Sequence, residues 1–173
     1  MHPLEKFRYC PACGSSRFAE NNLKSKHCAD CGFTYYANPS SATAAFILRS
    51  DGCLLVARRG KEPALGTLDL PGGFVDMDEK VEQGMAREIL EETGLRVDGL
   101  RYLFSIPNLY LYSGMTIHTI DMFYEVSVPM DVQPVADDDA AELMWIPVGD
   151  IDPQLFGLTS IRQAVERWLE EQY

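Results

Sequence analysis

The sequence predicts an α/β fold of the α+β type, a mixed sheet sandwiched between helices and preceded by a small cysteine-rich module. Strand-like segments flank a central amphipathic helix, and a second amphipathic helix follows them. Four of the five cysteines lie within residues 1–36, a segment poor in aliphatic residues. We therefore expect a module over residues 1–38 and a larger domain over residues 39–173.

The cysteine-rich module carries two knuckles, Cys10-Pro-Ala-Cys13-Gly and Cys28-Ala-Asp-Cys31-Gly. This spacing is typical of a tetrahedral four-cysteine zinc site, because each pair can present two thiolates to one ion. Two disulfides are the alternative. The odd cysteine, Cys53, and a charged N-terminal segment without an apolar signal core favour zinc. Zinc binding contributes about 10–16 kcal/mol in comparable peptides, enough to fold so small a module.

The larger domain begins after the turn-rich segment Asn38-Pro39-Ser40-Ser41. Two strands are expected at 42–49 and 53–58, joined by a turn at Asp51-Gly52, and a short strand at 68–70 precedes Gly72-Gly73. Later elements are expected in this order: strands at 96–106, 116–128 and 143–147, with an acidic loop at 129–141, and an amphipathic helix at 159–172.

The central helix has sequence signals at both ends. Asp76 and Glu79 match the spacing of a capping box, which predicts an N-cap at Asp76. Gly94 stands where a left-handed residue commonly ends a helix. The face that would pack on the sheet carries Ala86, Ile89, Leu90 and Thr93.

The other face of this helix is acidic. Glu88, Glu91 and Glu92 fall within an arc of roughly 100° at helical periodicity. Carboxylates so close together repel one another unless cations neutralise them, and hard divalent cations prefer carboxylate oxygens. The pattern therefore predicts a divalent metal site.

The net charge of −11 is unevenly distributed. Residues 1–36 carry five Lys/Arg and three Asp/Glu, a net +2, whereas residues 37–173 carry ten and 23, a net −13. Such an acidic body repels nucleic-acid backbones but suits a small phosphate-bearing molecule with metal ions between. No apolar run approaches the ~20 residues of a membrane span. We expect a cytoplasmic protein with neither a nucleic-acid nor a membrane partner.

The segment 73–95 resembles the Nudix box: Gly, five residues, Glu, seven residues, then Arg-Glu-aliphatic-x-Glu-Glu-x-Gly-aliphatic. The matching residues are Gly73, Glu79, Arg87, Glu88, Ile89, Glu91, Glu92, Gly94 and Leu95. The resemblance covers residues 41–173, and the preceding cysteine module is similar to the zinc ribbon of the NADH-pyrophosphatase branch. It implies hydrolysis of a nucleoside diphosphate linked to another group, by water attack on phosphorus, with Mg²⁺ or Mn²⁺.

The resemblance also implies roles for single residues. Glu88, Glu91 and Glu92 would bind the metal, with Gly73, Glu79 and Arg87 bracing the site. Glu142, just before Met144-Trp145-Ile146-Pro147, would be a further ligand or general base, so that Glu91, Glu92 and Glu142 form the catalytic set. The competitors of Glu142 are Asp137, Asp138 and Asp139.

The substrate is left open among three classes: NADH, ADP-ribose and diadenosine polyphosphates. The NADH-cleaving branch shares only Ser105 and Pro107 of its motif after the box, and a tyrosine at the position of Tyr112 is typical of diadenosine-polyphosphate enzymes. Candidate substrate-binding residues are Arg58, Arg59, Tyr110 and Tyr112.

Two other functions and one assembly state follow from the same resemblance. The first alternative is a non-catalytic nucleotide sensor that reuses the fold. The second is a nucleic-acid-directed protein that uses the mildly basic ribbon for docking. A homodimer is a possible assembly, since homodimers are common in the family.

Overall fold

The computed structural model describes residues 2–136 and 140–171. These residues form two compact units. One unit joins Met1–Pro39 to Leu109–His118, and the other joins Ser40–Asn108 to Thr119–Tyr173. Because residues 109–118 group with the N-terminal module, the domain boundary between residues 38 and 39 stays a prediction.

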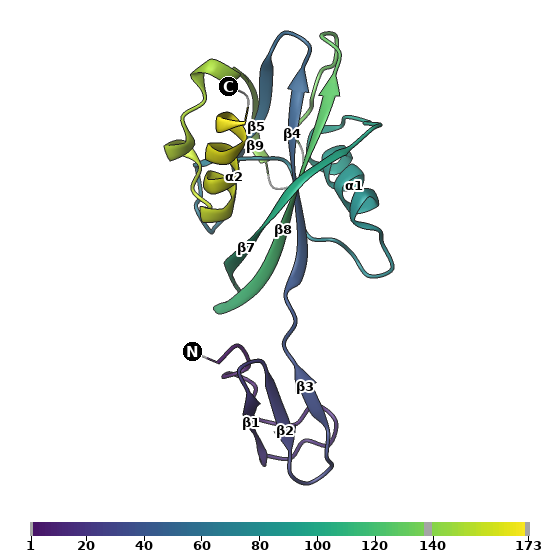
Figure 1. Ribbon diagram of the computed structural model, residues 1–173, viewed down its shortest axis with the longest axis vertical. Helices are drawn as coiled ribbons and strands as arrows, with labels where there is room; N and C mark the ends of the chain where they lie inside the picture. Colours follow the sequence, from purple (N-terminus) through teal and green to yellow (C-terminus); the bar gives the residue numbers. More distant parts are fainter. Residues whose placement is uncertain (1, 137–139, 172–173) are drawn as a thin grey trace. The chain divides into compact units, whose positions relative to one another are not determined.

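The first unit contains a three-stranded antiparallel sheet (Figure 1). Its strands are β1 (Phe18–Asn22), β2 (Ser25–Cys28) and β3 (Thr34–Tyr36), in the order β1-β2-β3. Its buried apolar cluster consists of only Cys10, Phe18 and Cys28. A core this small contributes little hydrophobic stabilisation, which agrees with a module that depends on a bound metal.

The second unit is built on a six-stranded mixed sheet, with strand order β6-β5-β4-β8-β7 and β9 paired to β5. The strands are β4 (Ser40–Arg49), β5 (Cys53–Arg59), β6 (Leu68–Asp69), β7 (Arg101–Tyr112), β8 (Met115–Val128) and β9 (Ala140–Pro147). β4 runs parallel to β8, whereas β5 is antiparallel to β4, β6 and β9. The predicted mixed sheet is confirmed.

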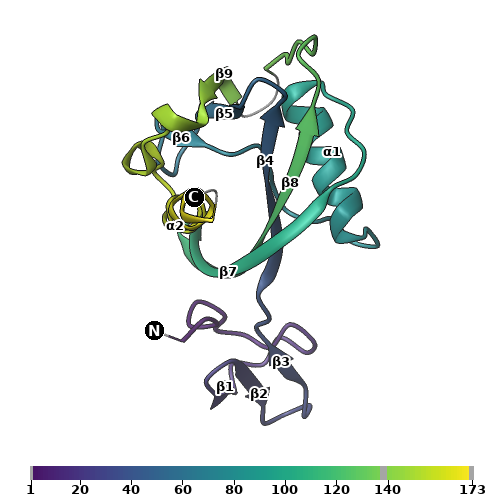
Figure 2. The ribbon, with the colours of Figure 1, turned by 45° about the horizontal axis from the view of Figure 1, so that its top comes forward.

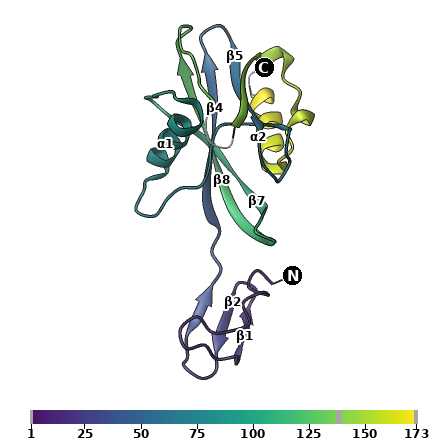
Figure 3. The same cartoon turned by 180° about the vertical axis from the view of Figure 1, so that it is seen from behind.

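Two helices, α1 (Val81–Thr93) and α2 (Thr159–Glu170), cover opposite faces of this sheet (Figures 2 and 3). Period-two alternation along β4 supplies both cores: Phe46 packs on the α2 side, and Ala45 and Ile47 pack on the α1 side. Two short 3₁₀ turns, Val148–Asp150 and Pro153–Leu155, connect β9 to α2. The predicted sandwich of helices around a sheet is confirmed.

Helix α2 packs through the apolar stripe that its sequence predicts. Ile161, Val165 and Trp168 are buried, and the Trp168 ring stacks on Phe46 with centroids 4.7 Å apart. Burial of each such side chain contributes about 1.5–3 kcal/mol. The indole N–H of Trp168 donates to Glu125 at 3.0 Å, so its one polar atom is satisfied.

The predicted N-cap of α1 is wrong. The helix begins at Val81 with Lys80 as N-cap, where the Lys80 N–H donates to the Gln83 side chain at 3.0 Å. Glu79 does accept from the Asp76 N–H at 3.0 Å, but Asp78 between them has a left-handed φ of 65°. The Asp76–Glu79 contact therefore closes a turn before the helix. At the other end, Gly94 has φ 69° and its N–H donates to Leu90, which confirms the predicted C-cap.

The predicted inner face of α1 is partly wrong. Ile89 and Thr93 are buried, as expected, but Leu90 is 36% exposed and Met85 is fully buried. Met85 and Ile89 are four residues apart and therefore lie one above the other on the face toward the sheet. The apolar stripe is thus centred on Met85 and Ile89, which turns Leu90 toward solvent.

Strand boundaries differ from prediction in the second half of the chain. Residues 96–100 lie before β7, which begins at Arg101 and continues to Tyr112, six residues beyond the expected end. β7 lies at one edge of the sheet order, where Pro107 is tolerated since one side of an edge strand is unpaired. β9 begins at Ala140, so the predicted acidic loop is shorter than expected.

Candidate active site

The segment between β6 and α1 runs along β4 through backbone hydrogen bonds. The Ala45 N–H donates to Pro71, the Thr43 N–H to Gly73, and the Val75 N–H to Ser41, all at 2.8–3.0 Å. A Cβ added to Gly72 would collide with the backbone carbonyl of Thr43. The glycine pair is therefore needed for this close approach, which brings the segment beside the acidic face of α1.

Gly73 makes room for the carboxylate of Glu88. A Cβ added at Gly73 would lie 2.5 Å from the Glu88 carboxyl carbon, far inside normal contact distance. The Glu88 side chain is only 15% exposed, and burial raises the pKa of its carboxyl, against the lowering effect of Arg87. A glycine backbone thus forms one wall of the Glu88 site.

Arg87 is the centre of an ion-pair network. Its Nε and Nη2 donate to the two carboxylate oxygens of Glu79, each at 3.0 Å. Its Nη1 donates to Glu88 at 2.7 Å and to Glu91 at 2.9 Å. Hydrogen bonding from Arg87 lowers the pKa of Glu79. One guanidinium therefore fixes the spacing of three carboxylates, through the planar fork that only arginine offers.

Glu92 completes the acidic face on the side of the glycine pair. Its Oε2 accepts from the Gly72 N–H at 2.9 Å, next to the glycine that contacts Glu88. Glu91 is the most open of the three, with half of its side chain exposed. The structure therefore gathers the predicted metal ligands Glu88, Glu91 and Glu92 around Arg87 and Gly72-Gly73. Their role as metal ligands stays a prediction.

Glu142 lies on β9, opposite Arg58 on β5. The Arg58 Nε donates to Glu142 at 3.3 Å, and both side chains are about half exposed. This cross-strand pair ties together two residues for which separate roles are predicted, metal or base chemistry for Glu142 and phosphate binding for Arg58. Its competitors Asp137, Asp138 and Asp139 lie outside the described residues.

Arg59 pairs with Asp69, a carboxylate that motif reading did not single out. The Arg59 Nε also donates to the Pro63 carbonyl at 2.7 Å, in the loop between β5 and β6. Burial raises the pKa of Asp69, against the lowering effect of Arg59. These contacts fit a loop-bracing role for Arg59, next to the predicted role in substrate binding.

Tyr110 and Tyr112 lie near the end of β7, within the residues that group with the N-terminal module. Tyr112 is 59% exposed. Their predicted part in substrate selection stays a prediction.

Gly84 is a site residue that pattern reading missed. A Cβ at Gly84 would lie 2.8 Å from a carboxylate oxygen of Glu79. The signal was present in the sequence, because an interior helical glycine costs about 1 kcal/mol relative to alanine and so calls for a packing reason. The reason here is room for the Glu79–Arg87 pair.

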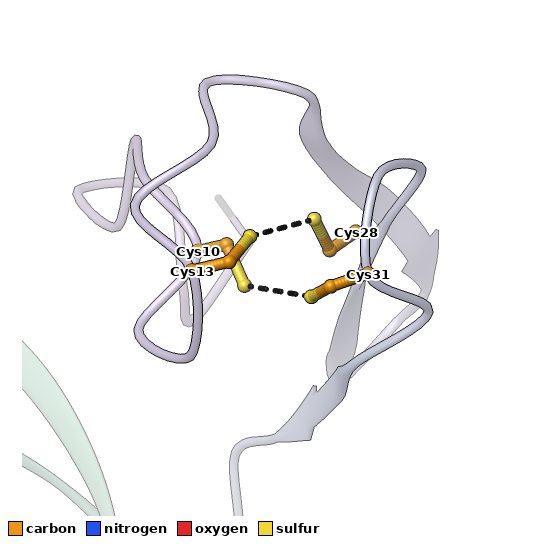
Figure 4. Close-up of side chains that lie close together, drawn as sticks. All are labelled: Cys10, Cys13, Cys28 and Cys31. Carbon is orange, nitrogen blue, oxygen red and sulfur yellow. Dashed lines mark hydrogen bonds between the residues drawn. The ribbon is translucent and has the colours of Figure 1, made fainter.

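The four cysteines Cys10, Cys13, Cys28 and Cys31 converge in the N-terminal module (Figure 4). Their sulfurs lie within 4.8 Å of one another, with Cys10–Cys31 and Cys13–Cys28 separations of 3.7 Å. Four thiolates on a tetrahedral zinc, with Zn–S of about 2.3 Å, are about 3.8 Å apart, whereas a disulfide is about 2.05 Å long. The cluster therefore fits zinc and excludes disulfides.

Backbone geometry supports the same assignment. Gly14 and Gly32 follow the two knuckles with φ of 75° and 77°, and their N–H groups donate to the Cys10 and Cys28 carbonyls at 2.8 and 2.9 Å. These tight turns require the left-handed conformation that glycine adopts freely. Backbone N–H groups, first that of Cys31, lower the pKa of Cys28 to about 6. Among the residues that the structure describes, this is the only group of three or more Cys, His, Asp or Glu side chains that converges as a candidate metal site.

No helix in the described part of the chain is long and apolar enough to cross a membrane.

Solved structures share this fold. A NUDIX hydrolase from Nitrosomonas europaea superposes with a TM-score of 0.73 at 21% identity, covering 95% of this chain and 92% of that one. A MutT NUDIX hydrolase from Burkholderia pseudomallei superposes with a TM-score of 0.64 at 28% identity, covering 75% of this chain and 97% of that one.

Sequence comparison agrees with the structural likeness. Similar proteins include the NAD-capped RNA hydrolases NudC of Vibrio atlanticus (strain LGP32), 31% identical over 169 residues, and of Vibrio cholerae, 31% identical over 182 residues. The alignments cover 94% and 98% of this chain but 62% and 60% of those proteins, so the chain spans about three fifths of their length. The family model described as NUDIX domain matches residues 38–169. The chain therefore belongs to the Nudix hydrolase family.

Proposed function

We propose that this chain hydrolyses the pyrophosphate bond of a nucleoside diphosphate joined to a second group, and that its substrate is an NAD-type dinucleotide, free or at the 5′ end of RNA. The observation that carries the reaction class is the contact between Gly73 and the Glu88 carboxylate within a complete Nudix box. The substrate class rests on similarity to proteins named NAD-capped RNA hydrolase, whose alignments extend over the ribbon as well as the Nudix domain.

Glu88, Glu91 and Glu92 would hold Mg²⁺ or Mn²⁺, ions that prefer oxygen ligands. The residues fit such an ion because Glu88 lies in a space that any side chain at residue 73 would fill, and Glu92 lies beside it at Gly72. A bound divalent ion supplies Lewis-acid polarisation of the pyrophosphate oxygens. Glu142 is proposed as an additional ligand or base, held near β5 by Arg58.

The protein's own groups position this chemistry. Arg87 holds Glu79 with two nitrogens and contacts Glu88 and Glu91 with the third, so the carboxylates keep their spacing. Glu91 is half exposed and can accept a proton from the attacking water. Water adds its oxygen to one phosphorus, and the bond from that phosphorus to the bridging oxygen breaks. The products of an NAD-type substrate are therefore two nucleoside monophosphates.

The four cysteines are proposed to hold a structural zinc ion, since a four-thiolate site offers no open position for substrate. The domain boundary between residues 38 and 39, cytoplasmic location and homodimer formation stay predictions from the sequence.

A turnover screen tests the substrate class. The chain would be assayed with Mg²⁺ or Mn²⁺ against NADH, ADP-ribose, a diadenosine polyphosphate and an NAD-capped oligoribonucleotide. Mass spectrometry of products formed in isotopically labelled water reports the bond cleaved and the phosphorus attacked. We expect the NAD-type substrates to have the highest kcat/KM. Failure to turn over every substrate would refute the proposal, and tight binding without turnover would identify a nucleotide sensor.

The substitution Glu91→Gln separates chemistry from fold. It preserves side-chain size and relieves like-charge repulsion, so the structure should persist while activity falls by about 100-fold or more, since even outer partners of metal ligands are worth roughly 10–100-fold. The matched control is Glu82→Gln, an exposed glutamate in the first turn of the same helix. Near-normal turnover by Glu91→Gln would contradict the assignment of Glu91.

A further inference from the structure

Three aromatic rings line one side of the N-terminal module. Tyr35 stacks on Phe7, with centroids 6.0 Å apart and planes 18° from parallel, and lies 6.5 Å from Phe33. Phe33 and Tyr35 are two residues apart at β3, so their side chains point to the same face of the strand. We call Phe7, Phe33 and Tyr35 the aromatic strip.

The strip is not the core of the module. The buried cluster contains Cys10, Phe18 and Cys28, whereas the three rings are each more than one third exposed, at 36%, 37% and 38%. Exposure of neighbouring aromatic rings in so small a module leaves apolar surface in water, which marks a binding surface more often than a structural one.

Cations accompany these rings. Lys6, Arg8 and Lys24 are exposed in the same module, whose net charge over residues 1–36 is +2. The buried Lys26 ammonium donates to the Phe7 carbonyl at 3.0 Å, which anchors the ring-bearing segment to β2. The remaining residues carry a net −13, so a polyanion is repelled by the Nudix domain and attracted only to this module.

We propose that the aromatic strip binds single-stranded RNA next to the NAD-type 5′ end, stacking about two or three bases and pairing their phosphates with Lys6, Arg8 and Lys24. Exposed rings in a basic setting are the recurring surface for unpaired nucleotides, because every base has a face to stack. Duplex RNA hides its base faces and fits the strip poorly. This inference rests on the proposed function, and it replaces the expectation from net charge that nucleic acid is no partner.

The first experiment measures binding without turnover. Fluorescence anisotropy of an uncapped, labelled single-stranded oligoribonucleotide would be recorded for the intact chain, for Tyr35→Leu and for Phe7→Leu. Leu23→Ala is the matched control, because Leu23 is 92% exposed in the same module but carries no ring. We expect each ring variant to weaken binding by about ten-fold, within the range for loss of one stacking ring. Zinc content, measured by thiol titration with zinc release, verifies that each module is folded.

The salt dependence provides a second readout of the same binding. With three basic side chains on phosphates, log Kd against log salt should have a slope magnitude near 2, about 0.7 per contact on single strands. No binding by the intact chain, or ring variants that bind as well as Leu23→Ala, would overturn the proposal. Self-association that Tyr35→Leu abolishes would likewise overturn it in favour of a second copy of this chain.

The second experiment separates this inference from the proposed function. The ratio of kcat/KM for an NAD-capped oligoribonucleotide to kcat/KM for the free dinucleotide should fall about ten-fold in Tyr35→Leu and stay unchanged in Leu23→Ala. An unchanged ratio in Tyr35→Leu refutes the strip while leaving hydrolysis intact. If the intact chain hydrolyses neither substrate, the proposed function fails, and the anisotropy measurements alone decide on the strip.

Discussion

The thiolates of the N-terminal module and the carboxylates of α1 are both predicted to bind metal, but the structure prepares them differently. The four sulfurs converge within 4.8 Å of one another. The glutamates are instead distributed between Arg87 and the Gly72 N–H. In the module, ligand geometry and fold are the same thing, because two tight turns place all four thiolates. In the Nudix domain, a packed core positions ligands that are already neutralised by a protein cation.

The difference follows from what each region can bury. The module has a buried apolar cluster of three residues. Each face of the larger sheet instead packs against a helix through a core that includes Phe46, Trp168, Met85 and Ile89. Metal should therefore be part of the folding free energy in the first region and a ligand of a preformed fold in the second.

Removal of zinc is the largest perturbation that tests this contrast. A chelator, or Cys13→Ser, should unfold residues 1–36 while the Nudix domain stays folded, since structural zinc contributes about 10–16 kcal/mol to comparable modules. Backbone amide NMR spectra would show collapse of the module resonances and retention of those from α1 and α2. Cys53→Ser, in β5, is the control and should change neither region. A module that keeps its dispersed resonances without metal would break the comparison.

Packing of α1 tests the other half. Met85→Ala should destabilise the Nudix domain by about 2–5 kcal/mol, because it leaves a cavity under a fully buried side chain. Leu90→Ala, at a 36% exposed position on the same helix, should cost about 1 kcal/mol or less. Urea denaturation monitored by the helical circular dichroism signal measures both. Equal costs would restore the inner face that the sequence periodicity predicted.

The glycine wall of the Glu88 site predicts a loss of activity with little loss of stability. In Gly73→Ala the new Cβ would lie 2.5 Å from the Glu88 carboxyl carbon, so the carboxylate must move. Misplacement by about 1 Å can cost on the order of 100-fold in rate. Gly149→Ala is the matched control, since a Cβ there meets nothing within 4 Å. Steady-state kinetics beside thermal melts would decide, and full activity in Gly73→Ala would remove the wall from the site.

Residues with local signals were predictable from the sequence. The Cys10–Cys13 and Cys28–Cys31 spacings, the C-cap at Gly94 and the mixed sheet with helices on both faces all follow from short-range patterns, and the structure agrees. The Glu79–Arg87 pair also lies where the box places it, with eight residues between the two positions.

The misses have a different physical origin. Asp76 and Glu79 have capping-box spacing, but Glu79 satisfies Arg87, so the helix starts four residues later. The choice between Met85 and Leu90 depends on the sheet that α1 covers, which no local pattern specifies. The Arg59–Asp69 and Arg58–Glu142 pairs depend on strand neighbours of β5 that are ten and 84 residues away in sequence. Long-range partners, more than residue types, are what the sequence left open.

Acid should separate the two regions through their ionised groups, and this is the smallest expected effect at neutral pH. The module should lose zinc first as pH falls, because thiolate ligands take up protons. In the Nudix domain, hydrogen bonding from Arg49 lowers the pKa of Asp51 to about 2, and Arg87 lowers that of Glu79. A carboxyl whose pKa is lower in the folded state contributes stability above its ordinary value of 3.8, and this contribution is lost as pH falls toward 2.

The substitution Asp51→Asn isolates that term. Both side chains of the Arg49–Asp51 pair are partly exposed, at 19% and 28%, so solvent screens the pair and the cost at pH 7 should be small. The variant should nevertheless flatten the fall of the urea midpoint between pH 5 and pH 2, because the group that protonates is gone. Glu82→Gln, whose carboxylate is exposed in the first turn of α1, should leave that fall unchanged. An Asp51→Asn curve parallel to that of the unmodified chain would show that acid acts on the Nudix domain through other carboxyls, with the Glu79–Arg87 network as the next to test.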